Sequence, residues 1–284
     1  MPEGDTIFRA ARALHRALAG QKVVHFESAY APLARVNDDT PLAERVIERV
    51  ESRGKWLLIF LSGDLILLTH MLMNGSWHIY RRGERWKRPR QQMRIVLTTV
   101  DYEAVAFNVP IAQFHTARTL ERHPAMQKLG PDLLKPHSAE DEIAARLRSH
   151  ADEEVANAIA NQQVMAGVGN VFKSEICFAC GIHPFRLVST LSAKEVECLI
   201  DTARKQLSMN VLESSGDRPV TYTGFRRTLH TSDEGARLWV YNRSGRPCRR
   251  CGTNIIMRKQ GRGARSTYWC PECQPMVSAV RSID

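Results

Sequence analysis

The sequence has no long apolar run. Its most apolar stretches, residues 56–61 and 65–68, are separated by Ser62-Gly63-Asp64, whereas a membrane-spanning helix needs about 20 consecutive apolar residues. Residues 1–20 also lack the apolar centre of a secretory signal, because charged side chains recur among them. We therefore expect a globular protein in the cytoplasm, with no membrane partner.

The sequence also has fewer acidic residues than basic ones. The 284 residues include 40 Lys and Arg but 30 Asp and Glu, for a formal net charge of +10. This excess suggests a polyanionic partner, with nucleic acid favoured over an acidic membrane surface. The basic residues gather in two clusters, one at Arg81, Arg82, Arg85, Lys87, Arg88, Arg90 and Arg94, the other at Arg243, Arg246, Arg249, Arg250, Arg258, Lys259, Arg262 and Arg265. A single cluster is commonly a solvated surface, but two favour nucleic acid.

Four of the seven cysteines form the most specific pattern, C-x2-C-x18-C-x2-C. They are Cys248, Cys251, Cys270 and Cys273. Two thiolate pairs at this spacing bind zinc tetrahedrally, and four ligands leave no open position, so we expect one structural zinc ion. Disulfides are the weaker alternative in a cytosolic chain. The other cysteines, Cys177, Cys180 and Cys198, fall on apolar helix faces and are predicted to be buried thiols.

The residues after Met1 offer different chemistry. If Met1 is removed, Pro2 becomes the N-terminus and its ring nitrogen a free secondary amine. An N-terminal amine titrates near about 8, so more of it is unprotonated at neutral pH than of a lysine. Such an amine attacks electrophilic carbon to form an iminium, and the Glu3 carboxyl beside it can transfer protons. The alternative, a plain helix start, is favoured while these residues are considered alone.

The hydrophobic period changes along the chain. Residues 5–19 predict a helix capped by Asp5 and stopped at Gly20. Short strands are predicted at 23–26, 46–53, 56–61, 65–71, 76–80, 93–98 and 104–108. Later segments predict helices at 141–148, 155–161, 170–180 and 192–213, the last with a Ser192–Glu195 capping box. The expected fold is α+β, with a sandwich or barrel-like sheet followed by helices.

Two connecting segments have a composition that suggests function. Gly167 and Gly169 precede Asn170, predicted to cap the next helix. A tight turn of this kind directs backbone N–H groups outward and can bind phosphate, with an ordinary helix–helix corner as the alternative. Residues 214–245 predict a long loop, in which 238–241 form either a strand or the lead-in to the cysteine module.

These pieces together resemble the formamidopyrimidine-DNA glycosylase / endonuclease VIII family. The resemblance rests, in order, on Pro2-Glu3-Gly4, Arg53-Gly54-Lys55, His70-Met71-Leu72-Met73-Asn74-Gly75, Gly167-Val168-Gly169-Asn170 and the four-cysteine finger. It implies an N-terminal β-sandwich with flanking helices over residues 1–125, a helix–two-turn–helix domain over 126–240 and a zinc finger over 241–284. Double-stranded DNA is the implied partner, and we expect a monomer.

The resemblance also implies catalytic roles. Pro2 would attack the anomeric carbon of the sugar and release the base, and Glu3 would protonate the sugar ring oxygen. Lys55 would hold a phosphate and assist elimination. Arg265, five residues before Cys270, would contact phosphate and serve the second elimination, with Arg258 and Arg262 as competitors for that role.

DNA-binding roles follow in the same way. Asn170 and Gly169 would bind phosphate at the glycine turn. Leu72 and Met73 are either core residues or, because Asn74-Gly75 predicts an exposed turn, apolar wedges that fill the gap left by a flipped base.

The implied activity is that of a bifunctional DNA glycosylase and abasic-site lyase that flips and excises oxidised bases, then cleaves the strand by beta and delta elimination. Residues 108–114 lack the Arg-Phe pair typical of the 8-oxoguanine branch, so we expect oxidised pyrimidines to be favoured. The alternatives are an 8-oxoguanine-preferring glycosylase and a non-catalytic zinc protein that binds damaged DNA. A metal-dependent nuclease would need a carboxylate cluster with open metal geometry, which the sequence lacks. A bacterial source would imply association with the nucleoid.

Overall fold

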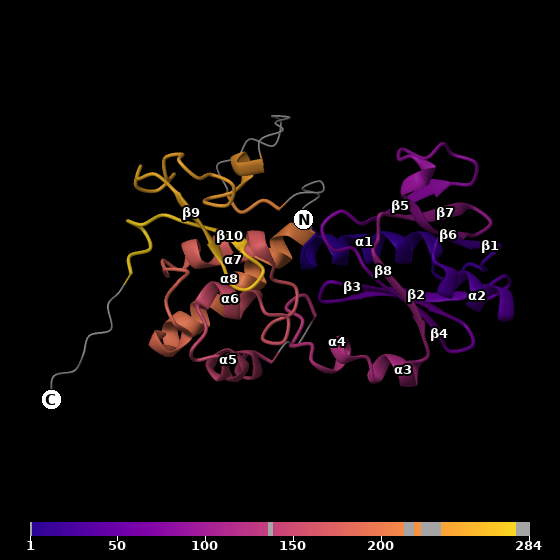
Figure 1. Cartoon of the computed structure of the whole chain (residues 1–284), viewed down its shortest axis with the longest axis horizontal. Coiled ribbons are helices and arrows are strands. Elements are labelled where there is room, and N and C mark those ends of the chain that lie inside the picture. The colour runs from indigo at the N-terminus through magenta and orange to yellow at the C-terminus, as the bar shows by residue number, and fades with distance from the viewer. Residues whose placement is uncertain (1, 136–138, 213–218, 223–233, 277–284) are drawn as a thin grey trace. The chain divides into compact units, whose positions relative to one another are not determined.

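The protein is described by a computed structural model over residues 2–135, 139–212, 219–222 and 234–276 (Figure 1). The chain divides into two compact units, Met1–Lys128 and Leu129–Asp284. The finger that the sequence analysis assigned to a third domain is part of the second unit. Among the described residues, no helix has both the length and the apolar character to cross a membrane.

The first unit contains two antiparallel four-stranded sheets, with strand orders β1-β6-β7-β5 and β2-β3-β4-β8. The strands are β1 (His25–Ser28), β2 (Ile47–Arg53), β3 (Trp56–Leu61), β4 (Leu65–His70), β5 (Ser76–Arg81), β6 (Met93–Thr98), β7 (Tyr102–Phe107) and β8 (Ile111–His115). All seven predicted strands are present, with ends shifted by at most two residues. The sequence analysis missed β8, an edge strand whose burial does not alternate.

The strands β3 and β4 are almost continuously apolar because both of their faces are covered. Leu57 and Ile59 belong to the core between the sheets. Leu58 and Phe60 point the other way and pack with Leu120, which lies in α3 (Ala117–Glu121), followed by α4 (Pro124–Gln127). Apolar runs buried on both faces lose the alternation of a half-exposed strand.

The helix α1 (Gly4–Leu18) closes the core of the first unit, with Ile7, Leu14 and Leu18 at most 1% exposed. The structure corrects its predicted cap. Glu3 occupies the N-cap position, and Asp5 lies inside the first turn with a fully buried side chain. The predicted stop is confirmed: Gly20, just beyond the helix, adopts φ +81°, which costs glycine little.

Four short helical elements of the first unit were not predicted. They are α3 and α4, together with α2 (Ala31–Asp39) and the 3-10 turn η1 (Arg90–Gln92). Leu33 is the only buried residue of α2, so the helix leaves almost no hydrophobic period in the sequence.

The second unit is helical and carries a β-hairpin. Its helices are α5 (Glu140–Ser149), α6 (Val155–Ala160), α7 (Asn170–Ala179) and α8 (Ala193–Leu212), with 3-10 turns η2 (Val188–Thr190) and η3 (Glu234–Arg237). The hairpin pairs β9 (Ile256–Gln260) with β10 (Arg265–Trp269). The capping box before α8 is confirmed: the Ser192 N–H donates to Glu195 Oε2 at 2.8 Å, and the Glu195 N–H donates to Ser192 Oγ at 3.3 Å. The predicted α+β architecture is therefore correct.

The structure corrects the prediction for two cysteines. Cys180 at the end of α7 and Cys198 in α8 form a disulfide, with Cα atoms 6.0 Å apart, inside the usual range of about 4.4–6.8 Å. The two helices pack on each other, which the sequence spacing did not reveal. Cys177 is the predicted buried thiol, and burial raises its pKa to about 12.

A single buried carboxylate anchors the segment that leads into the finger. Glu175 in α7 is fully buried and accepts the backbone N–H groups of Trp239 at 2.9 Å, Val240 at 2.9 Å and Tyr241 at 2.8 Å. The hydroxyl of Thr221 donates to the same carboxylate. Residues 238–241 are therefore a lead-in to the finger and not a strand. Half of the predicted long loop, 214–218 and 223–233, lies outside the described residues.

We expect Glu175→Ala to lower the free energy of unfolding by about 3 kcal/mol or more, because a buried donor without an acceptor costs about 1–3 kcal/mol. Urea titration followed by tryptophan fluorescence measures the change. Glu197→Ala, an exposed carboxylate on α8, is the matched control. Equal urea midpoints for the two variants would contradict the anchoring role.

Candidate functional site

The start of the chain is held against the first unit. Glu3 is the N-cap of α1, its side chain is 0% exposed, and its backbone oxygen accepts the Ile7 N–H at 3.0 Å. Pro2 is half-buried beside it. The sequence analysis placed these residues together but did not foresee that the Glu3 carboxyl would be removed from water. Burying a carboxyl group costs free energy, and such burial is typical of residues that take part in a reaction.

A second carboxyl near the N-terminus was missed. Asp5 is buried, and this burial raises its pKa although Arg9 Nη2 lies 3.5 Å from Asp5 Oδ2. Two buried carboxyl groups therefore stand within four residues of the N-terminal amine that Met1 removal would create. A carboxyl group whose pKa is shifted in such a position, as that of Asp5 is, is a candidate for proton transfer.

Lys55 lies in the turn between β2 and β3, beside His70 at the end of β4. Burial first, and then the Lys55 charge, lower the pKa of His70 to about 4. The neutral ring accepts the Leu72 N–H on Nδ1 at 3.1 Å, and its centroid is 4.7 Å from that of Trp56. His70 thus connects the lysine turn to the loop that begins at Met71, a link that sequence separation concealed.

Leu72 and Met73 are exposed, at 45% and 66%, and do not belong to the core. Leu72 adopts φ +45°, and the loop closes at Gly75, where a Cβ would lie 2.5 Å from the Met71 oxygen. Large apolar side chains held outward by a tight loop can act as wedges between bases.

Two arginines that the sequence analysis did not connect with this loop lie beside it. Arg88 and Arg94 line a hollow of about 930 Å³ together with Leu72, Met73 and Asn108. The Arg94 Nη1 donates to the backbone oxygens of Gln91 at 3.0 Å and Met93 at 2.8 Å. Basic side chains are thus available here although residues 108–114 contain none.

In the second unit, the glycine turn leads directly into α7. Gly169 is the N-cap and Asn170 the first helical residue, which corrects the predicted Asn170 cap. Asn170 is 6% exposed, and its Nδ2 lies 3.5 Å from the Tyr241 hydroxyl. Within the described part of the chain, its Oδ1 is buried without a hydrogen-bond partner.

The amide of Asn170 fits the hydroxyl in either orientation. Its oxygen and nitrogen can exchange places, because a hydroxyl both donates and accepts. In the exchanged orientation, Tyr241 donates to Oδ1 and the Nδ2 donors are left for a ligand. A buried amide with one unsatisfied end is expected where a ligand completes the hydrogen bonding.

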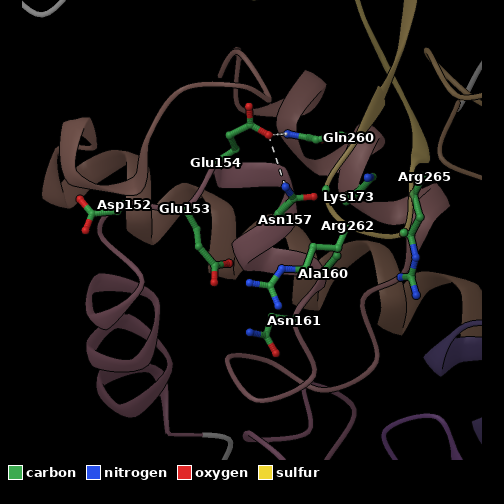
Figure 2. Close-up of a pocket in the computed structure, with 12 residues that line it drawn as sticks. Asp152, Glu153, Glu154, Asn157, Ala160, Asn161, Lys173, Gln260, Arg262 and Arg265 are labelled. Atoms are coloured by element: carbon green, nitrogen blue, oxygen red, sulfur yellow. Dashed lines mark hydrogen bonds between the residues drawn. The ribbon is translucent and has the colours of Figure 1, made fainter.

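A hollow of about 720 Å³ lies between α6 and the finger hairpin (Figure 2). Arg262, Arg265 and the buried Lys173 line it with the acidic residues Asp152, Glu153 and Glu154. Arg258, the other competitor for the role of Arg265, does not line it, because its guanidinium stacks 5.0 Å from the centroid of the Phe185 ring. The structure therefore brings Arg265 and Arg262 to one site and separates them from Arg258.

The four-cysteine motif forms one cluster. The sulfur atoms of Cys248, Cys251, Cys270 and Cys273 all lie within 4.8 Å of one another. Four thiolates at this separation fit a tetrahedral soft metal ion, and zinc is the ion that such sets bind most often.

Two family models and several curated relatives match this chain, and they point to the same family. Residues 1–111 match the family model described as the formamidopyrimidine-DNA glycosylase N-terminal domain, and residues 129–218 match that of the formamidopyrimidine-DNA glycosylase H2TH domain. The probable endonuclease 8 2 of Streptomyces coelicolor is 40% identical over 277 residues, covering 96% of this chain and 94% of the relative. The DNA-(apurinic or apyrimidinic site) lyase Nei2 of Mycolicibacterium smegmatis is 39% identical over 274 residues, covering 96% and 99%.

Solved structures show the same fold. A complex of Lactococcus lactis Fpg with DNA containing an abasic site has a TM-score of 0.79 and 22% identity, covering 96% of this chain and 100% of that one. A β-sandwich followed by a helix–two-turn–helix domain and a four-cysteine hairpin defines the Fpg-like class of proteins. The chain belongs to the formamidopyrimidine-DNA glycosylase family.

The lowered pKa of His70 makes stability depend on pH. Between about 4 and the ordinary value of 6.5, the unfolded chain binds more protons than the folded one, so stability is lost as pH falls through this window. We expect His70→Asn, which keeps an acceptor for Leu72 but does not titrate, to flatten this loss in urea titrations at pH 4.5 and 7. His25→Asn, which removes an exposed imidazole, is the control. If the free energy of unfolding falls equally between pH 7 and pH 4.5 in the wild type and in His70→Asn, the assignment is refuted.

Proposed function

We propose that the chain is a bifunctional DNA glycosylase and abasic-site lyase that acts on damaged bases in double-stranded DNA. The observation that carries the proposal is the N-terminal pair, in which a buried Glu3 carboxyl follows directly on Pro2. Relatives named endonuclease 8 and abasic-site lyase, aligned over nearly the whole chain, support it. We expect a cytoplasmic location for such an enzyme, with association to the nucleoid if the source is bacterial.

The proposed reaction begins at the Pro2 nitrogen. The unprotonated amine attacks C1′ of the sugar, and the base leaves with the electrons of the glycosidic bond and takes up the proton that the nitrogen loses. Glu3 protonates the ring oxygen as the sugar opens, which leaves the iminium. The resulting iminium acidifies the neighbouring C2′ proton. Loss of that proton expels the 3′ phosphate, and a second elimination expels the 5′ phosphate. Hydrolysis of the iminium then returns the free amine.

Phosphate binding is assigned to four positions. Asn170 and the turn at Gly169 offer the unsatisfied amide and the backbone N–H groups of a helix start. Lys55 supplies a cation in the first unit, and Arg265 supplies one at the finger hairpin. Leu72 and Met73, exposed on their loop, are assigned the wedge role.

One structural zinc ion is assigned to the four-cysteine cluster. The donor set is closed, so the ion supplies folding free energy and no open position for chemistry. Its place is at the end of the hairpin opposite Arg265, since Cys270 follows β10 directly.

Borohydride with an abasic-site duplex should trap a covalent adduct at Pro2, because reduction fixes the iminium as a stable amine. Peptide mass spectrometry locates the modified residue. A chain that keeps Met1 is the control, since its amine is displaced from Pro2, whereas Pro2→Gly is uninformative because glycine retains an amine. An adduct on Lys55 would contradict the proposed mechanism.

Arg265→Ala should weaken DNA binding and impair the second elimination more than base release. Removing one phosphate contact should reduce the slope of log K against log salt by about one unit. Arg258→Ala removes the same charge from the same hairpin and should leave the slope closer to that of the wild type. Indistinguishable slopes for the wild type and Arg265→Ala would count against phosphate contact.

We further propose that oxidised pyrimidines are the favoured lesions. The reaction at Pro2 takes place on the sugar and does not read the base, so selectivity comes from flipping and from the pocket. Saturated pyrimidines stack poorly, which lowers the few kcal/mol that unstacking costs. The endonuclease 8 names of the relatives and the absence of an Arg-Phe pair in residues 108–114 support this choice.

Single-turnover excision of dihydrouracil or thymine glycol should be faster than that of 8-oxoguanine opposite cytosine in the same sequence. Each lesion is to be placed opposite all four bases, because Arg88 and Arg94 lie beside the wedge loop. Faster release of 8-oxoguanine, with strong dependence on cytosine, would place the chain in the other branch.

A further inference from the structure

The finger hairpin is fastened to α6 at its tip by Gln260. This side chain is 4% exposed, and its Nε2 donates to Glu154 Oε2 at 2.8 Å and to the Pro184 oxygen at 3.1 Å. Its Oε1 accepts the Thr267 hydroxyl at 2.7 Å. Both amide hydrogens and the amide oxygen are therefore engaged, so the orientation of Gln260 is fixed.

The acceptor on the helical side is equally constrained. Glu154 is the N-cap of α6, and its Oε2 also accepts Asn157 Nδ2 at 3.3 Å, as Figure 2 shows. The first residue of the hairpin turn, Gly261, lies against the same asparagine, since a Cβ there would be 2.9 Å from Asn157 Oδ1. The turn thus rests on the first turn of α6 without room for a side chain.

Gln260 is also the residue closest to Arg265 across the hairpin. The two are paired in the β9–β10 register, at the end next to the turn 261–264. The cysteine cluster stands at the other end, five residues after Arg265 along an extended strand, or roughly 16 Å away at about 3.3 Å per residue. A metal at that distance and the hydrogen bond from the Tyr268 N–H to Ser174 on α7 hold the hairpin toward its cysteine end. Neither of these restraints reaches the tip.

We propose that Gln260 is a positioning residue for Arg265. It fixes the hairpin tip on α6 and thereby sets where the Arg265 guanidinium stands relative to the turn at Gly169 and Asn170. The role assigned to Arg265 rests on the proposed function, whereas the fastening of the tip does not. Zinc and Gln260 act at opposite ends of the hairpin, so the loss of Gln260 should leave the metal site intact.

The first test needs no catalysis. Hydrogen–deuterium exchange of the full-length zinc-loaded protein, without DNA, should be faster across residues 261–265 in Gln260→Ala than in wild type, with one zinc per chain in both. Ser266→Ala, which removes a half-buried hydroxyl bonded to Lys259 on the same hairpin, should leave the exchange unchanged. Unchanged exchange in Gln260→Ala, or loss of its zinc, would overturn the proposal.

The second test measures how the reaction divides between its two eliminations. On a preformed abasic-site duplex, Gln260→Ala should lower the ratio of second to first elimination product by about tenfold, since an ångström of misplacement costs up to about a hundredfold. Base release in single turnovers should change by less than about twofold, because it depends on Pro2 and Glu3. A purely structural defect would slow all steps together, and that result would refute a positioning role.

A double-mutant cycle identifies the partner. Glu154→Ala removes one of the three hydrogen bonds of Gln260 and should reproduce part of the effect of Gln260→Ala. The double variant should lose little more than Gln260→Ala alone, because that variant has already lost the bond to Glu154. Glu154→Gln keeps an acceptor oxygen and should restore most of the product ratio. Additive losses would show that the two residues act separately. If the wild type opens no abasic site, the proposed function fails, while the exchange measurement still decides whether Gln260 holds the tip.

Discussion

The second unit depends on hydrogen bonds made by polar groups buried in α7. Glu175 gathers three successive backbone N–H groups of residues 239–241, which have no strand to satisfy them. One residue earlier, the Ser174 hydroxyl accepts the Tyr268 N–H of the hairpin at 3.3 Å. Backbone donors without partners are costly inside a protein. The finger can pack where it does because this helix supplies the missing acceptors.

The same helix links that packing to the glycine turn. Its N-terminus carries Gly169 and Asn170, and Asn170 contacts Tyr241, a residue that Glu175 holds in place. The glycine turn, the lead-in to the finger and the hairpin are therefore positioned by one helix of ten residues. Gln260 adds a further connection through α6, so the hairpin has contacts with two helices as well as its cysteine cluster.

In the first unit, the corresponding constraint is the burial of two acidic side chains at the edge of a large apolar core. The helix α1 is fixed by Ile7, Leu14 and Leu18, and it holds the Glu3 and Asp5 side chains out of water at its first turn. Burial of the His70 ring, and then the Lys55 charge, lower the pKa of His70 and keep the ring neutral as an acceptor for Leu72. A neutral histidine thus connects the lysine turn to the loop of Leu72 and Met73.

The sequence by itself determined the fold class, seven strands, the main helices and the four-cysteine cluster, because periodicity and ligand spacing are local. It also indicated Pro2 and Glu3 as a candidate pair, because removal of Met1 would turn the proline nitrogen into a secondary amine beside a carboxyl group. Only the tertiary structure decided which groups far apart in sequence meet. It paired Cys180 with Cys198, brought Arg88 and Arg94 to the loop of Leu72 and Met73, separated Arg258 from Arg265 and joined Gln260 to Glu154. Such pairings depend on how helices and sheets pack, and a pattern read along one segment carries no information about the surface that another segment presents to it.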